Sequence, residues 1–194
     1  MNSEWCQKRK VIQSYDATAY LYDMRYAEEQ KAKFEAALRN TKFFEQNRIL
    51  DLGCGTGLLF DYIISKAEIL VGLDISKRIL TEAKRKYGKF GNVYLVLADA
   101  DYAPFKDGVF THVFAVTILQ NMPSPEKTIV ETKRVTVKNA IIVFTGLKKK
   151  FSVELLEALL RKSGLKIIGI MDEVNLKCYV AICENNVPNS IHQR

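Results

Sequence analysis

Residues 49–57 read ILDLGCGTG, and this stretch decides the fold of the chain. A short apolar run enters a turn that has glycine at three alternate positions, and residues with helical spacing follow it. Glycine lets the backbone adopt positive φ and lets a ligand approach the main chain closely. The spacing G-x-G-x-G differs from the G-x-G-x-x-G of dinucleotide sites. The stretch therefore predicts a buried strand, a ligand-binding turn and a helix.

Apolar runs of the kind buried in parallel sheets recur on both sides of this turn and alternate with segments of helical spacing. This alternation predicts an α/β fold with a doubly wound, mainly parallel sheet, in which ligands bind at the carboxyl ends of the strands. Two last runs with little between them predict an antiparallel hairpin that ends the sheet. The runs are 48–52, 69–73, 93–97, 109–116, 140–145, 166–170 and 177–183.

Helical patterns precede the first strand and follow the fifth. Tyr15, Ala19 and Tyr22 share one face of a helix, and a second helix follows before residue 45. Ser152 and Gly164 are placed to cap the two ends of a later helix. Since no repeat or linker interrupts the chain, we expect one domain over 1–194. Its expected parts are a helical lid segment (1–45), an α/β core (46–184) and a flexible tail (185–194).

Acidic residues stand where the second and third strands end. Asp74 closes the second strand, where its carboxylate can accept hydrogen bonds from both ribose hydroxyls of a nucleoside lying over the glycine turn. Asp99 follows the third strand, where it can accept from an adenine amino group. Such charge-assisted bonds contribute roughly 1.5 to 3 kcal/mol each when buried. The pattern predicts a nucleoside site at this edge of the sheet.

Together, residues 51–57, Asp74, Asp99 and the stretch APFKDGVF at 103–110 resemble the successive motifs of class I S-adenosylmethionine-dependent methyltransferases. The resemblance covers about residues 14–184. It implies a Rossmann-like, seven-stranded sheet with an antiparallel last strand and N-terminal lid helices. S-adenosylmethionine is the implied cofactor, and Asp51 would hold its amino group. The implied cofactor-binding residues are Tyr15, Tyr22, Asp51, Gly53, Cys54, Gly55, Asp74, Ile75, Asp99, Ala100 and Val116.

The segment after the fourth strand points to the acceptor. Residues 118–125 contain no general base, which an alcohol acceptor would require near neutral pH. Asn121-Met122-Pro123-Ser124 loosely resembles the Asn/Asp-Pro-Pro-aromatic loop of methyltransferases that modify exocyclic amines of bases, although Met122 and the missing aromatic depart from it. Asn121 would then orient the amino group as a catalytic residue, and Pro123 would shape the loop. The alternative is a simple helix-starting turn with prolines at its edge.

Positive charge suggests an anionic partner. The net charge is +7 and the isoelectric point is near 9.2. Lys148, Lys149 and Lys150 follow the fifth strand at its carboxyl end, and Lys8-Arg9-Lys10 precedes the expected lid. These cations could contact RNA phosphates. We therefore expect methylation of a base amino nitrogen in ribosomal or transfer RNA, with cytidine N4 as the guess and Lys148 to Lys150 as substrate contacts.

Other functions remain open. The Pro-Phe-x-Asp-Gly-x-Phe pattern at residues 104–110 is shared with small-molecule methyltransferases of quinone biosynthesis, which predicts a closed apolar pocket under the lid. A protein acceptor and a noncatalytic binding subunit are two further alternatives. No insertion could form a separate RNA-binding domain, so an accessory protein is a possible partner.

Composition argues against several classes of protein. No apolar stretch of about 18 residues occurs, so we expect a cytoplasmic protein without a membrane partner. The four cysteines form no Cys-x-x-Cys pair and only two histidines accompany them, so neither a metal site nor a disulfide framework is expected.

Overall fold

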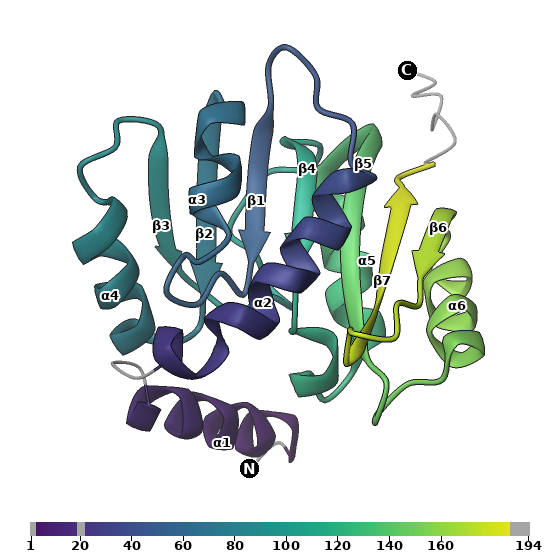
Figure 1. The fold of residues 1–194 in the computed structure, drawn as a ribbon, viewed down its shortest axis with the longest axis horizontal. Helices are drawn as coiled ribbons and strands as arrows, with labels where there is room; N and C mark the ends of the chain where they lie inside the picture. The colour runs from purple at the N-terminus through teal and green to yellow at the C-terminus, as the bar shows by residue number, and fades with distance from the viewer. Residues whose placement is uncertain (1–2, 19–21, 187–194) are drawn as a thin grey trace, which may run out of the picture.

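A seven-stranded sheet flanked by helices forms the centre of the molecule (Figure 1). The computed structural model describes residues 3–18 and 22–186, and for Thr18 and residues 22–26 it describes the backbone alone. The strands are β1 (Arg48–Leu52), β2 (Ile69–Asp74), β3 (Val93–Leu97), β4 (Phe110–Ala115), β5 (Thr136–Leu147), β6 (Lys166–Met171) and β7 (Cys178–Glu184). The helices are α1 (Ser3–Thr18), α2 (Tyr22–Arg39), α3 (Phe60–Ile63), α4 (Lys77–Tyr87), α5 (Pro125–Val135) and α6 (Val153–Lys162), with short 3₁₀ turns η2 (Ile64–Lys66) and η3 (Leu119–Asn121).

The strand order is β3-β2-β1-β4-β5-β7-β6. Strands β1 to β5 pair in parallel, and β7 pairs antiparallel with both β5 and β6. The expected doubly wound, mainly parallel sheet with an antiparallel last strand is confirmed. Because the chain order reverses direction at β1, the loops after β1 and β4 leave the sheet on either side of a crevice at its carboxyl edge.

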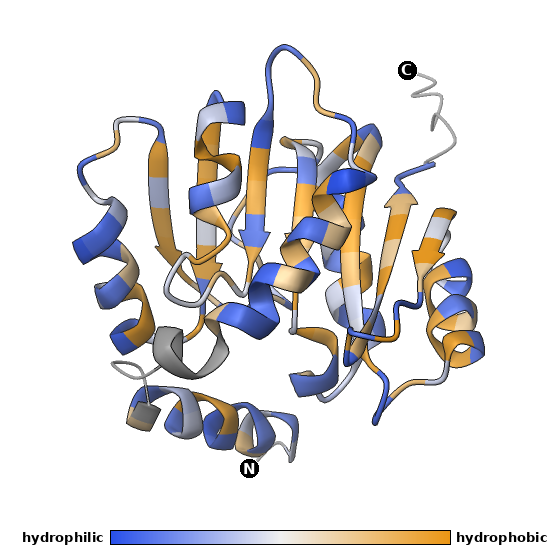
Figure 2. Cartoon of the chain, viewed as in Figure 1, coloured by the Kyte–Doolittle hydropathy of each residue, from blue (hydrophilic) through white to orange (hydrophobic). Residues whose placement is uncertain are grey.

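Apolar residues fill both faces of the sheet. Ile49 and Leu50 are fully buried neighbours in β1, and they enter two different apolar clusters. Successive side chains of a strand point to opposite faces, so burial of both shows that helices cover the sheet on each side. Figure 2 shows the central strands coloured mainly as hydrophobic, whereas α1 alternates hydrophilic and hydrophobic residues.

Several helix ends lie where local sequence chemistry places them. The Ser152 hydroxyl accepts a hydrogen bond from the Leu155 N–H at 3.2 Å, and Gly164 adopts φ +74° just after α6. Both residues therefore cap α6 as the sequence predicts. Ser76 caps α4 in the same way by accepting from the Ile79 N–H at 3.1 Å. This second cap lies directly beside the acid that ends β2.

The helix after the glycine turn is shorter than the spacing of Leu58, Leu59 and later residues predicts. The turn continues to Leu59, and α3 begins only at Phe60. Gly57 has φ +80°, and a Cβ there would lie 2.9 Å from the Tyr87 ring. Since a right-handed helix cannot run through positive φ, no helix can include Gly57.

The N-terminal segment forms two helices whose division differs from the predicted one. Tyr15 lies in α1, whereas Tyr22 begins α2, so the expectation that they share one helix face is wrong; Ala19 lies outside the described residues. Helix α1 crosses the carboxyl edge of the sheet, while α2 runs up one face of it (Figure 1). One straight helix could not cover both surfaces.

Within the described residues, no helix combines the length and apolar character that crossing a bilayer requires. The same part of the chain contains no group of three or more His, Cys, Asp and Glu residues that could hold a metal ion.

Candidate functional site

The glycine turn is fastened to the end of β2. The N–H groups of Gly53 and Cys54 both donate to the Leu73 carbonyl, at 2.8 and 3.0 Å. The Gly55 N–H donates to the Asp74 carboxylate at 3.0 Å. Gly53 and Gly55 have φ of +76° and +56°, which side chains with a Cβ rarely adopt. The turn therefore presents its backbone to the space above β1 and β2.

The Asp74 carboxylate accepts backbone hydrogen bonds from two sides. Besides Gly55, the Ser76 N–H donates to its carboxylate at 2.9 Å. Burial raises the pKa of Asp74, and the hydrogen bonds from Ser76, Gly55 and Ile75 partly oppose this rise. The Ser76 hydroxyl also donates to Asp16 of α1. The end of β2 and helix α1 are thus joined beside the position expected for a ribose.

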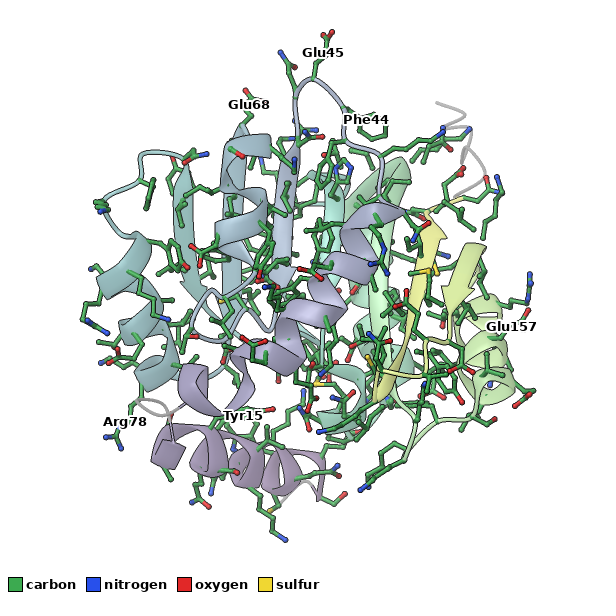
Figure 3. The ribbon with its side chains drawn as sticks, viewed as in Figure 1. Tyr15, Phe44, Glu45, Glu68, Arg78 and Glu157 are labelled. Atoms are coloured by element: carbon green, nitrogen blue, oxygen red, sulfur yellow. The ribbon has the colours of Figure 1, made fainter. Side chains whose placement is uncertain are left out.

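A cleft opens between this edge of the sheet and α1. Its lining is polar near the ends of β2 and β3 and apolar near the end of β4. Figure 3 shows Tyr15 on α1, next to the carboxyl edge. The lining residues are Lys8, Val11, Tyr15, Gly53, Gly55, Leu73, Asp74, Ile75, Ile79, Asp99, Ala100, Val116, Thr117, Ile118, Asn121 and Met122.

Lys8 reaches from α1 into the polar end of the cleft. Its Nζ lies 2.7 Å from both Asp99 carboxylate oxygens and 2.5 Å from Asp101 Oδ2, and its side chain is only 8% exposed. Burial lowers the pKa of Lys8, but the hydrogen bonds to Asp101 and Asp99 outweigh it, so the pKa lies above its ordinary value. A carboxylate has about four acceptor positions, so Asp99 can accept from a ligand amino group beside Lys8.

Asp51 lies in a second, smaller pocket behind the glycine turn. The pocket is lined by Gln30, Phe34, Asp51, Gly53, Cys54, Gly55, Leu58 and Val116. Burial raises the pKa of Asp51 to about 8, with a further contribution from the Asp74 carboxylate. Among the described residues, no hydrogen-bond or ion-pair partner reaches the Asp51 carboxyl. A buried carboxyl without a partner is costly, which indicates that a cationic or hydrogen-donating ligand belongs here.

At the end of β4, Asn121 and Tyr15 meet across the cleft. The Asn121 amide group donates to the Tyr15 hydroxyl at 3.1 Å and to the Thr117 carbonyl at 3.0 Å. Its carbonyl oxygen has no partner in the described part of the chain. Thr117 has φ +63°, an unfavourable conformation for a β-branched residue. The Thr145 hydroxyl accepts from the Thr117 N–H at 2.7 Å and helps to hold this conformation.

The lysine loop after β5 lies at the same edge of the sheet but outside the cleft lining. Lys148 pairs with Asp172 at 2.7 Å and donates to the Glu173 carbonyl at 2.9 Å. Lys149 and Lys150 are exposed. The expected substrate role of Lys148 to Lys150 therefore has no contact with the cleft to support it, because the loop leaves the sheet on the side of β7 and α6.

The structure gathers most of the residues that the sequence singled out. Tyr15, Asp51, Gly53, Cys54, Gly55, Asp74, Ile75, Asp99, Ala100, Val116 and Asn121 all line one of the two pockets. Pro123 is half-buried and lines neither. The Tyr22 side chain lies outside the described residues. Sequence reasoning missed Lys8 as a cleft residue, and also Gln30 and Thr117, because no spacing rule links α1 or α2 to distant strand ends.

Comparisons with known proteins agree with this geometry. A family model described as a methyltransferase domain matches residues 50–144. Malonyl-(acyl-carrier protein) O-methyltransferase of Marinomonas sp. is 30% identical over 155 residues, covering 78% of this chain and 56% of that protein. Demethylmenaquinone methyltransferase of Staphylococcus saprophyticus is 30% identical over 122 residues, covering 60% and 51%. The chain thus spans about half the length of these curated relatives.

One solved structure is similar over nearly the whole chain. It is the complex between the Haloferax volcanii Trm112 methyltransferase activator and the putative methyltransferase, with 15% sequence identity, a TM-score of 0.79, and 90% of this chain and 96% of that chain covered. At this level of identity the likeness shows the fold alone.

Proposed function

Because this chain belongs to the class I S-adenosylmethionine-dependent methyltransferases, we propose that it transfers the cofactor's methyl group to an acceptor bound in the apolar part of the cleft beneath α1. The cofactor is S-adenosylmethionine, whose sulfonium supplies an activated methyl group and a neutral leaving group. The residues of the cleft determine where the two reactants lie and what kind of acceptor can react.

The described residues fit this cofactor. Asp74 and Asp99 offer carboxylate oxygens to a ribose and an adenine amino group, and the Gly53–Gly55 turn allows close approach of the ligand to the backbone. Asp51, buried without a partner, suits the ammonium of the amino-acid end. Each part of the cofactor therefore has a complementary group at a different strand end.

The acceptor end of the cleft favours a nucleophile that needs no deprotonation. Neither histidine nor glutamate is among the residues that line the cleft, and its two aspartates lie at the nucleoside end. An alcohol would require a general base there. A carboxylate oxygen, an electron-rich ring carbon or an amine can attack the methyl group directly, with orientation contributing roughly 7 to 11 kcal/mol in favourable cases.

The single observation that carries the proposal is the apolar wall beneath the lid helix. Val11 of α1 faces the same space as Ile118 and Met122, which follow β4. This wall suits an apolar small molecule or an acyl chain on a carrier. The relatives that act on a malonyl-acyl carrier protein and on demethylmenaquinone are named for acceptors of these kinds.

The test is transfer of labelled methyl from S-adenosylmethionine by the purified chain. Acyl-carrier-bound carboxylates, quinols and unmodified RNA are offered separately, with Asp74→Ala as the control that loses the cofactor site. Transfer to a carboxylate or quinol, insensitive to salt, supports the proposal. Transfer to RNA alone would overturn the apolar acceptor, and cofactor binding without transfer to any acceptor would favour a noncatalytic subunit.

Methylation of an RNA base amine, with cytidine N4 as the specific guess, is a second candidate. One observation favours it: Asn121 and Tyr15 both line the cleft, and the Asn121 amide nitrogen donates to the Tyr15 hydroxyl at 3.1 Å. The Asn121 carbonyl oxygen could then accept a hydrogen bond from a base amino group while the Tyr15 ring stacks on the base. Nucleoside mass spectrometry of ribosomal and transfer RNA from cells with and without the gene tests it. Loss of one methylated nucleoside that wild type restores and Asn121→Ala does not would establish this substrate.

An accessory protein is part of the proposal as well. The similar Haloferax volcanii protein was solved with an activator, which supports a search for a partner of this chain. Copurification of tagged chain from its own cells, followed by the same transfer assay with and without the partner, measures whether activity depends on it.

A further inference from the structure

The two edges of the sheet differ in how they are protected. Within the described residues, β3 pairs with β2 alone and β6 pairs with β7 alone, so each edge strand has one open side. Strand β6 has a register shift between Ile167 and Gly169, and Lys166 at its start pairs with Glu184 at 3.3 Å. Irregularities and charges of this kind hinder an edge strand from pairing with another chain. Strand β6 is therefore a protected edge.

Strand β3 has neither form of protection. Its residues VYLVL carry no charge and keep a regular register with β2 throughout. The Asn92 carbonyl and the Ala98 N–H both bond to β2, and in a parallel ladder alternate residues face the neighbouring strand. Leu95 and Leu97 therefore direct their backbone N–H and C=O groups toward the open side. Such an edge is a template for one more strand.

Apolar side chains are exposed along the same edge. Tyr94 and Leu97 are 53% and 55% exposed, and they point to opposite faces of the sheet because they are an odd number of positions apart. Phe90 before the strand and Tyr102 after it are exposed as well. An added strand could therefore cover apolar surface on both faces.

Helix α4 supplies positive charge beside this edge. It packs against β3 and lies at the outer side of that strand in Figure 1. It contains five basic residues and one acidic residue, Glu82, which pairs with Arg85 at 3.1 Å. Lys77, Arg78 and Lys84 are exposed, and Figure 3 shows Arg78 pointing away from the molecule. The edge is thus apolar along the strand and positively charged beside it.

We infer that β3 is the docking edge for a partner protein that adds one strand to the sheet and carries acidic residues facing α4. This inference rests on the proposed function, because it gives the accessory protein a place on the chain. A second copy of this chain would bring a second basic α4 to the same edge, where like charges repel. A nucleic acid would leave the backbone groups of the strand unpaired and would find no ring at Leu97 on which to stack a base. Because β3 ends two residues before Asp99, the partner would also hold the strand end that presents this acid to the cofactor.

Photocrosslinking in the chain's own cells tests the edge. The photoreactive residue p-benzoylphenylalanine replaces Tyr94 in the full chain, and in the matched control it replaces Ile168 on β6, because both side chains are 53% exposed. We expect position 94 to crosslink one protein of net negative charge, identified by mass spectrometry, and position 168 not to crosslink it.

The identified protein is then purified, and calorimetry measures its binding to the chain. Tyr94→Lys should weaken binding by about tenfold or more, because it places a charge in the apolar contact. The double variant Lys77→Glu/Lys84→Glu should weaken binding to a similar extent and reduce its salt dependence. Ile168→Lys and Lys162→Glu, at the opposite edge, should change binding less than about twofold.

Hydrogen exchange distinguishes an added strand from mere proximity. Exchange of the Leu95 and Leu97 amides should slow by about tenfold or more when the partner binds, since both would donate to the added strand. Unchanged exchange, equal crosslinking at both edges, no crosslinked protein, or crosslinks only to RNA or to a second copy would overturn the inference. S-adenosylhomocysteine binding by the chain alone is measured in parallel, and its absence would refute the cofactor site without altering the result at the edge.

Discussion

Two basic triplets lie at the carboxyl edge of the sheet, and they have different environments. In Lys8-Arg9-Lys10, within α1, Lys8 is buried between Asp99 and Asp101. In the loop from Lys148 to Lys150, the cations face outward or pair with the exposed Asp172. A run of three adjacent cations therefore attaches a helix to the sheet in one place, through Lys8, and forms a solvent-exposed loop in the other. A run of basic residues in the sequence does not by itself predict which of these two environments it has.

Removing the buried cation should have the largest effect. Lys8→Met would leave the Asp99 and Asp101 carboxylates without their counter-charge, and we expect the free energy of unfolding to fall by about 3 kcal/mol. Urea denaturation measures this loss. Lys10→Met, at an exposed position of the same helix, should cost less than about 0.5 kcal/mol. Similar losses of unfolding free energy in both variants would show that the buried position of Lys8 contributes no more to stability than an exposed one.

Burial of the Asp51 carboxyl should make ligand binding at the cofactor site depend on pH. With its pKa raised to about 8, this carboxyl holds a proton at neutral pH, whereas pairing with a ligand ammonium requires the ionised form. S-adenosylhomocysteine affinity should therefore rise as pH increases, by up to about tenfold per unit, and level off above about pH 8. Calorimetry in buffers of different ionisation enthalpy measures the released proton. A pH profile in Asp51→Asn as steep as that of wild type would refute the assignment.

The ion pair of the loop should matter much less. Lys148 and Asp172 are both accessible to water, with side chains 28% and 57% exposed. A double-mutant cycle of Lys148→Met and Asp172→Asn should give a coupling free energy below about 1 kcal/mol. A coupling as large as the loss at Lys8 would show that the loop is structural after all.

Replacing the two remaining loop lysines should have the smallest effect on stability and on transfer to a small acceptor. The double variant Lys149→Ala/Lys150→Ala should change stability by less than about 0.5 kcal/mol and leave transfer to a small acceptor unchanged. If RNA is the substrate, the same variant should weaken RNA binding and reduce its salt slope by about one per lost phosphate contact. Filter binding at several salt concentrations separates these results.

Much of the fold and of the nucleoside site followed from local sequence. The run at residues 48–52, the glycine turn and the acid Asp74 are close in sequence, and hydrogen bonds within that unit place them. The caps of α6 were predictable from Ser152 and Gly164 for the same reason. Hydrophobic periodicity and turn preferences depend on residues close together in the chain, so a single sequence is enough to predict these features.

Only the tertiary structure decided what lies opposite these residues. Lys8 meets Asp99 across 91 residues of chain, and Gln30 meets Thr117 across 87. No periodicity encodes such contacts, because they depend on how α1 and α2 pack on the sheet. The sequence by itself determined the family, the cofactor and the strand ends that present its acids. Packing determined which cations enter the cleft and which remain in solvent, since burial is a property of the whole fold.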